Sequence, residues 1–136
     1  MSVLRDILVI EDEAAVAGAV VMGCNDEGMT VSAVESATEA LELLDHTRFR
    51  LILCDIMMQG FDGFRLLEEV ARRDISTPVV MMTGYSTMEN AVRSLSAGAV
   101  DYLPKPFTAD ELLTVIRRSL HMGELLGAES TGARPD

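Results

Sequence analysis

The chain has 136 residues, a length that fits one domain, and 49% of them are hydrophobic, which supports a folded core. It carries 22 acidic and 11 basic side chains, a formal net charge of −11. A protein this acidic has no general attraction for DNA or RNA, so direct nucleic-acid binding is not expected. No apolar run approaches the roughly 20 residues of a membrane span, and no signal peptide is evident. We therefore expect a cytoplasmic protein that makes no contact with membranes.

Five short apolar runs are spaced along the chain and predict five β-strands: Ile7–Ile10, Met29–Val34, Leu51–Cys54, Val79–Met82 and Ala99–Leu103. Three of the runs, ILVI, LILC and VVMM, are uninterrupted, as expected for strands that are covered on both faces. The second run alternates, with Met29, Val31 and Ala33 on one side, which indicates an edge strand.

Apolar residues at helical spacing fill the segments between these runs, and capping boxes mark the starts of three helices. The boxes are Ser36-x-x-Glu39, Ser86-x-x-Glu89 and Thr108-x-x-Glu111. A first helix is expected over residues 13–27, although Gly18 and Gly23 each weaken it by about 1 kcal/mol relative to Ala. Gly98 stands where a C-terminal cap is expected, just before the fifth strand.

The alternation of strands and helices predicts the fold class. Right-handed crossovers between successive strands give an α/β domain, a parallel sheet with helices on both faces. We expect this domain to cover residues 1–122. Residues 123–136 are small and polar and end in Ala-Arg-Pro-Asp, so we expect them to form a flexible tail or the start of a linker.

Polar side chains follow four of the five predicted strands. They are Glu11 and Asp12 with Glu13 after them, then Asp55, then Thr83 and Gly84, and finally Lys105. Ligands of open α/β sheets bind at the carboxyl ends of the strands, so these groups are expected to share one site. Carboxylates within about 5 Å of one another repel by roughly 3 kcal/mol per pair at an effective dielectric constant near 20. Lys105, the single Lys of the chain, offsets part of this charge, and the remaining oxygen ligands favour Mg²⁺.

Four strings of the sequence carry a resemblance to a known family: ILVIEDE, LILCDIMMQGFDGF, PVVMMTGYS and GAVDYLPKPF. From about residue 6 to residue 120, the chain resembles the receiver domain of two-component response regulators, the CheY-like domains. The resemblance implies a flavodoxin-like (βα)5 fold, a doubly wound sheet of five parallel strands in the order 2-1-3-4-5. It also implies that Asp55 accepts a phosphoryl group from a sensor histidine kinase or a histidine phosphotransfer protein.

The resemblance further implies a set of metal ligands around Asp55. Asp12 would bind Mg²⁺ directly, Glu11 would bind it through water, and Met57 would contribute its backbone carbonyl. Glu11 stands where Asp is more common, and its longer side chain still suits a water-mediated contact. Gln59 stands where the family usually has Pro, which removes a fixed φ and brings an amide that could modulate dephosphorylation.

The remaining roles concern the phosphoryl group and the output. Thr83, Gly84 and Lys105 would contact the phosphoryl oxygens, Tyr102 would be the aromatic switch residue, and the Lys105–Pro106 bond would be cis. Phosphorylation would shift the surface formed by the fourth helix, fifth strand and fifth helix, which would control an output protein or a missing effector domain. The same surface could form a homodimer. The domain would be a switch and not an enzyme, because its only chemistry is its own phosphorylation and slow hydrolysis.

Three other interpretations of the same α/β pattern are weaker. An aspartyl phosphatase generally needs a second acid two residues after the nucleophile, where this chain has Met57. A flavin carrier needs a phosphate-binding loop after the first strand, but the acidic residues there would repel a flavin phosphate. A receiver-like domain that works only through protein contacts would have no need for the acidic residues. Cys24 and Cys54 fit no disulfide or zinc pattern and are interpreted as buried thiols.

Overall fold

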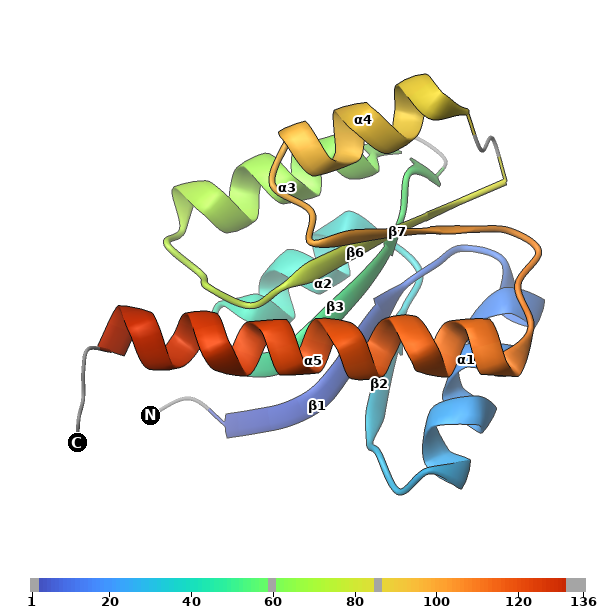
Figure 1. The fold of residues 1–136 in the computed structure, drawn as a ribbon, viewed down its shortest axis with the longest axis horizontal. Helices are drawn as coiled ribbons and strands as arrows, with labels where there is room; N and C mark the ends of the chain where they lie inside the picture. Colours follow the sequence, from blue (N-terminus) through green and yellow to red (C-terminus); the bar gives the residue numbers. More distant parts are fainter. Residues whose placement is uncertain (1–2, 59–60, 85–86, 132–136) are drawn as a thin grey trace.

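The computed structural model describes residues 3–58, 61–84 and 87–131. Its central feature is a parallel sheet of five strands in the order β2-β1-β3-β6-β7 (Figure 1). The strands are β1 (Val3–Ile10), β2 (Val31–Val34), β3 (Thr47–Asp55), β6 (Val79–Thr83) and β7 (Asp101–Pro104). Counted along the chain, this is the predicted order 2-1-3-4-5, and β2 lies at the predicted edge.

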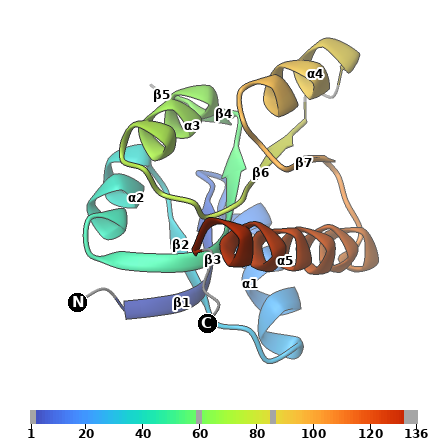
Figure 2. The ribbon, with the colours of Figure 1, turned by 60° about the vertical axis from the view of Figure 1, so that its left-hand side comes forward.

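Helices cover both faces of the sheet (Figures 1 and 2). One face packs against α1 (Ala14–Asp26) and α5 (Ala109–Thr131). The other face packs against α2 (Ala37–Leu44) and α3 (Gly63–Arg72), and α4 (Met88–Ser96) lies on the same side (Figure 2). This arrangement confirms the predicted doubly wound α/β architecture.

The core explains why three strand sequences are apolar without interruption. Along β1, Ile7 and Val9 join the cluster under α1 and α5, whereas Leu8 and Ile10 join the cluster under α2 and α3. All four side chains are fully buried. Because successive side chains of a strand point to opposite faces, a strand that is covered on both sides must be apolar at every position.

The strand boundaries differ from the prediction where a strand is only half covered. Strand β3 begins at Thr47 instead of Leu51, and its first residues pair with the start of β1, with Val3 opposite Thr47. In this first half, buried and exposed residues alternate, as in Phe49 and Arg50. The apolar run therefore marked only the doubly covered half of the strand. A short antiparallel hairpin, β4 (Met57–Met58) and β5 (Phe61–Asp62), was not predicted.

Two of the three predicted capping boxes are present. The backbone N–H of Glu39 donates to Ser36 Oγ at 3.2 Å, and Thr108 and Glu111 exchange hydrogen bonds of 2.8 and 3.1 Å. The third was placed one residue early: Ser86 lies outside the described residues, and Thr87 caps α4. Gly98 has a φ of +112°, the left-handed conformation expected of a residue that ends a helix.

Helix α5 continues past residue 122, where the sequence placed the end of the domain, and reaches Thr131. Gly123 lets the helix approach the sheet closely, because a Cβ there would lie 2.8 Å from Pro78 Cγ. Glu124 then pairs with Arg50 of β3 at 3.2 Å. The predicted tail from residue 123 is thus helical as far as Thr131, and the rest of it, residues 132–136, lies outside the described residues. In the described part of the chain, no helix combines the length and apolar character of a membrane span.

Candidate functional site

Four strands deliver polar side chains to the carboxyl edge of the sheet. Glu11 and Asp12 follow β1, Asp55 ends β3, Thr83 ends β6, and Lys105 follows β7. Of the residues that the sequence predicted for the site, the structure brings together Glu11, Asp12, Asp55 and Lys105. Carboxylate oxygens of Glu11, Asp12 and Asp55 all lie within 4.8 Å of one another, close to the separation of about 5 Å considered from the sequence.

Burial makes this cluster of carboxylates costly. Glu11 is 1% exposed and Asp55 is 4% exposed, whereas Asp12 is partly open to solvent. Burying like charges side by side is unfavourable unless a positive charge compensates them. The sheet thus holds the negative charge in place through its backbone, although the charges repel one another.

Lys105 is the cation that the described residues place among these carboxylates. Its Nζ lies 2.7 Å from Glu11 Oε1, 3.2 Å from Asp55 Oδ2 and 3.3 Å from Glu13 Oε1. Glu13 was given no role in the predicted site, although it is the third acid of the string EDE. One ammonium group therefore faces three carboxylates, and Asp12 lies beside them.

The pKa values express this imbalance. Burial raises the pKa of Glu11 to about 7, although Lys105 and the backbone N–H of Glu13 act to lower it. Burial also acts to lower the pKa of Lys105, but the carboxylates of Glu11 and Asp55 outweigh it and raise that pKa above its ordinary value. Lys105 is therefore charged at neutral pH, and its charge alone does not keep Glu11 fully ionised.

The donor set fits a hard divalent cation. All three candidate ligands in the cluster are carboxylates, and oxygen ligands of this kind suit Mg²⁺. Two of them are buried, so a bound cation would replace hydration that these groups have lost. Glu11, Asp12 and Asp55 are the residues that would hold the ion.

The β4–β5 hairpin supports Asp55 from the side. The backbone N–H of Met57 donates to Asp55 Oδ1 at 3.2 Å, so the main chain of Met57 lies beside the carboxylate. Gly63 permits the close return of the chain, because a Cβ there would lie 2.4 Å from the carbonyl oxygen of Asp55. The sequence motif Phe61-Asp62-Gly63 could have indicated this turn. Gln59, the candidate modulator, lies outside the described residues.

The phosphoryl-binding and switch candidates lie on the neighbouring strands. Thr83 is fully buried at the end of β6, and Gly84 after it is exposed. The backbone N–H of Lys105 donates to the carbonyl of Thr83 at 2.8 Å, which aligns the ends of β6 and β7, and the Lys105–Pro106 bond is cis as expected. Tyr102 on β7 is partly buried, and its hydroxyl has no hydrogen-bond partner among the described residues.

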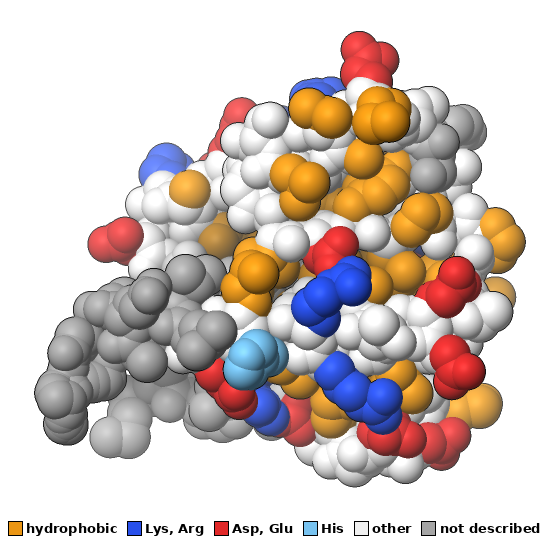
Figure 3. All heavy atoms as spheres, viewed as in Figure 1, with side chains coloured by type: hydrophobic (Ala, Val, Ile, Leu, Met, Phe, Trp, Pro, Cys, Tyr) orange, Lys and Arg blue, Asp and Glu red, His pale blue; other side chains and the backbone are white. Residues whose placement is uncertain are grey.

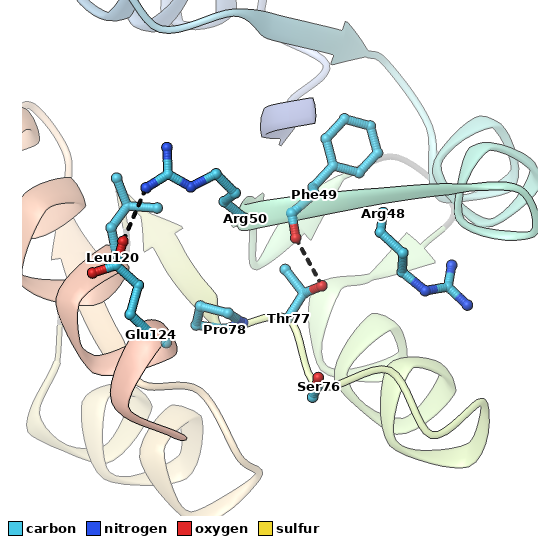
Figure 4. A pocket seen from close by; sticks show the side chains of 9 residues that line it. Arg48, Phe49, Arg50, Ser76, Thr77, Pro78, Leu120 and Glu124 are labelled. Carbon is cyan, nitrogen blue, oxygen red and sulfur yellow. Dashed lines mark hydrogen bonds and ion pairs between the residues drawn. The ribbon is translucent and has the colours of Figure 1, made fainter. Parts of the chain in front are cut away.

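The opposite edge of the sheet is hollowed as well but has a different character (Figure 4). There Arg50 pairs with Glu124, and the Thr77 hydroxyl donates to the carbonyl of Phe49 at 2.9 Å. These polar groups satisfy one another across the start of β3, the segment before β6 and the C-terminal part of α5. This hollow therefore differs from the carboxyl edge, because its Arg50–Glu124 pair is exposed and, among the described residues, it holds no cluster of buried like charges.

A doubly wound sheet with this set of side chains at its carboxyl edge is the architecture of receiver domains. The family model for the response regulator receiver domain matches residues 7–117, so the chain belongs to this family. The fold and site thus define a domain of two-component signalling proteins.

Among regulators of known sequence, the chain is similar to the nitrogen assimilation regulatory protein NtrX of Azorhizobium caulinodans. The two are 38% identical over 118 residues, which are 85% of this chain and 26% of that protein. The first curated relatives that the chain matches, response regulators called NtrX-like from Rickettsia species, are also covered over only 26% of their length.

Solved structures give the same result. The receiver domain of NtrX from Brucella abortus has a TM-score of 0.80 and 37% identity, over 85% of this chain and 98% of that one. A CheY-like receiver domain protein from Methanospirillum hungatei has a TM-score of 0.82 and 33% identity, over 89% and 97% of the two chains. The chain is thus a receiver domain similar to those of NtrX-type regulators.

Proposed function

We propose that this receiver domain is a phosphorylation-dependent switch in which Asp55 accepts a phosphoryl group with the help of Mg²⁺. The observation that carries the proposal is the cluster of Glu11, Asp12 and Asp55, whose oxygens lie within 4.8 Å of one another beside one Lys. Such a site has surplus negative charge, which a divalent cation would compensate, and the cation would in turn attract the oxygens of a phosphoryl group. The donor would be a phosphohistidine of a sensor kinase or of a phosphotransfer protein.

The reaction transfers the phosphoryl group from a nitrogen of the donor histidine to a carboxylate oxygen of Asp55. One Asp55 oxygen forms the new O–P bond while the P–N bond to the donor breaks, and the imidazole, protonated on its other nitrogen, leaves as the neutral ring. Mg²⁺, when bound, would neutralise charge on the phosphoryl oxygens. Lys105 already lies 3.2 Å from Asp55 Oδ2, so it is positioned to bind an oxygen of the incoming group. The Met57 N–H holds the other carboxylate oxygen and thereby orients Asp55.

The output would follow from the groups beside the new phosphoryl group. The Thr83 hydroxyl and the Gly84 N–H would turn toward its oxygens, and Tyr102 would follow. Among the described residues the buried Tyr102 hydroxyl has no hydrogen-bond partner, which supports such a rearrangement, because a new contact can recover the free energy that this costs.

The surface that responds would be the one formed by α4, β7 and α5. Figure 3 shows hydrophobic side chains gathered over α4 on this face. Met88, Val92 and Leu95 of α4 are 82%, 55% and 52% exposed, so an apolar surface is open to a partner. An output protein, an effector domain of a longer regulator, or a second copy of the chain would bind there. Phosphorylation would change the populations of two states of this face.

The same proposal covers catalysis, partners and location. The domain would catalyse its own phosphorylation and a slow hydrolysis of the aspartyl phosphate, and it would not act as an enzyme on other molecules. It would work in the cytoplasm, and it would not bind DNA itself, because its net charge of −11 repels a polyanion.

The test is incubation with acetyl phosphate and Mg²⁺, followed by intact-mass measurement. We expect the wild type and the control variant Asp110→Asn, which changes an exposed residue of α5, to gain one phosphoryl group. Asp55→Asn should gain none, because an amide is not a nucleophile for this transfer. If the wild type gains no mass, or if Asp55→Asn gains as much as the wild type, the proposal is wrong.

A further inference from the structure

Helix α4 contacts the segment after Asp55 through one arginine. The Arg93 guanidinium carbon lies 3.8 Å from the centre of the Phe64 ring, and its Nη2 lies 3.8 Å from Asp62 Oδ2. Arg93 belongs to α4, Phe64 to the first turn of α3, and Asp62 ends the β4–β5 hairpin. A planar guanidinium is attracted both by the face of an aromatic ring and by a carboxylate, so the two contacts reinforce each other.

The hairpin connects this contact to the phosphoacceptor. Asp62 lies directly opposite Met57 in the antiparallel pair, and the Met57 N–H donates to Asp55 Oδ1. Two residues, Asp62 and Met57, therefore connect the Arg93 side chain to the Asp55 carboxylate. A displacement of Asp62 would be felt at the main chain of Met57, because the two are paired.

The hairpin needs support from outside. It consists of two residue pairs, and an isolated two-stranded hairpin is marginally stable in water. On its inner side, the backbone N–H of Gly63 donates to the carbonyl of Ile56 at 2.7 Å. The Met58 side chain is buried in the core and anchors one residue of β4, whereas the Met57 side chain is 58% exposed and adds little. On the outer side, Arg93 contributes to the wall of a hollow that Met57, Asp62 and Phe64 also line.

Asp62 can couple α4 to the hairpin because its two carboxylate oxygens contact two different helices. Its Oδ1 accepts the backbone N–H of Phe64 at 2.8 Å and so caps α3, while its Oδ2 faces Arg93. The first hydrogen bond fixes the carboxylate relative to α3, and the guanidinium then fixes it relative to α4. The hairpin is held between two helices.

We propose that Arg93 is a positioning residue for the phosphoacceptor site. It acts through Asp62 to hold the main chain of Met57 beside Asp55, and so keeps the Met57 carbonyl available for the metal. The part of this inference that concerns the metal rests on the function proposed above. Arg93 also lies on the helix that exposes Met88 and Val92, so a partner that displaces α4 would loosen the site through this contact.

The contact itself is tested by backbone hydrogen exchange of the unphosphorylated full chain and its variants, without metal or phosphodonor. In Arg93→Ala we expect the amides of Met57 and Met58 to exchange about two- to fivefold faster, the factor that corresponds to one exposed cation–π contact. Arg93→Lys keeps the charge opposite Asp62 but cannot stack a planar group, so its exchange rates should lie between those of the wild type and Arg93→Ala. Arg117→Ala is the matched control: Arg117 is 61% exposed against 57% for Arg93, and it pairs with Glu27 away from the hairpin.

Calorimetric titration with Mg²⁺ tests the consequence for the site. Arg93→Ala should weaken Mg²⁺ binding by about two- to fivefold, whereas Arg117→Ala should match the wild type. Asp62→Asn keeps an oxygen to cap α3 but loses the charge that faces Arg93. The double variant Asp62→Asn/Arg93→Ala should therefore lose less Mg²⁺ affinity than the sum of the losses in the two single variants. Equal exchange and equal Mg²⁺ affinity in Arg93→Ala and Arg117→Ala would overturn the inference. Failure of the proposed function would give a different result. The wild type would gain no phosphoryl group, while the hydrogen exchange of the Met57 and Met58 amides would still be faster in Arg93→Ala.

Discussion

Two carboxylates of the first strand region, Asp6 within β1 and Glu11 just after it, are in opposite situations. At the amino edge, Asp6 Oδ2 accepts hydrogen bonds from the backbone N–H of Thr30 at 2.8 Å and from its hydroxyl at 3.2 Å, and Arg50 lies 3.3 Å from Oδ1. The backbone hydrogen bond, with help from Arg50, holds the pKa of Asp6 below its ordinary value. At the carboxyl edge, burial raises the pKa of Glu11 to about 7.

The two edges differ in how fully hydrogen-bond donors and cations compensate the charge of their carboxylates. At the amino edge, a partly exposed carboxylate receives hydrogen bonds from Thr30 and an ion pair from Arg50, so it contributes to folding. At the carboxyl edge, buried carboxylates share one Lys, so the folded protein carries unbalanced charge there. Charge left unbalanced by the fold points to a ligand, because a ligand is then the partner that completes it.

The largest expected difference between the edges concerns their cations. Replacement of Lys105 by Ala leaves buried carboxylates without a counter-ion and should lower the free energy of unfolding by about 2–3 kcal/mol at pH 8 without metal. Replacement of Arg50, which is 39% exposed, by Ala should cost about 1 kcal/mol or less. Urea unfolding monitored by circular dichroism measures both. Similar losses in the two variants would show that the edges do not differ in this way.

The pH dependence of stability should reveal Glu11. Its pKa in the folded protein is about 7, above the ordinary 4.5, so the folded state holds an extra proton between these values. The resulting stability is fully present below pH 4.5 and is lost as the pH rises through 7. In Glu11→Gln without divalent metal, this decline, on the order of 2 kcal/mol, should disappear from urea unfolding curves taken between pH 5 and pH 8. If the free energy of unfolding of Glu11→Gln declines by the same amount over this pH range, a group other than Glu11 causes the decline.

Mg²⁺ binding should depend on the carboxyl edge alone. We expect Asp12→Ala to weaken Mg²⁺ binding at least about tenfold, because the variant removes one of the few carboxylate ligands of the ion. Asp6→Ala removes the same charge at the opposite edge and should leave the affinity close to that of the wild type. Isothermal titration measures both affinities, and an unchanged value in Asp12→Ala would show that the metal assignment is wrong.

The smallest effects should have opposite signs at the two edges. Asp55→Asn removes a charge that repels Glu11 and should raise the free energy of unfolding by about 1 kcal/mol without metal. Asp6→Asn weakens hydrogen bonds to a charged acceptor and should lower it by about 0.5 kcal/mol. Thermal and urea unfolding in a chelator compare the two, and a loss of stability in Asp55→Asn would contradict the view that its charge is held at a cost.

Much of the site was predictable because parallel strands place their carboxyl ends at one edge. Once the apolar runs around Ile7–Ile10 and Leu51–Cys54 were identified as neighbouring strands, the acids that follow them had to lie close together. Glu13 was placed after the first strand but given no role, because an acid at the start of a helix is ordinary, and only the position of Lys105 shows that it belongs to the cluster. The contact between Arg93 and Asp62 was missed because it joins α4 to the β4–β5 hairpin, which are distant in the chain, and leaves no local pattern.

Helix ends and strand ends were less predictable for a related reason. The run Leu51–Cys54 marks where β3 is covered on both sides, but the strand begins at Thr47 because it pairs with β1. The sequence predicts a tail from Gly123 onward. The helix nevertheless continues through Gly123, because the absence of a side chain there lets α5 lie against Pro78. Local propensity was overridden in both places by contacts distant in the chain.

The sequence by itself determined the doubly wound fold and the acidic site, because both follow from local periodicity and from the residues that end each strand. Tertiary structure alone decided how the charges are balanced: which carboxylates Lys105 contacts, how strongly burial raises the pKa of Glu11, and how Arg93 supports the hairpin beside Asp55. The physical reason is that periodicity depends on neighbours along the chain, whereas burial and Coulomb energy depend on distances between segments that the fold brings together.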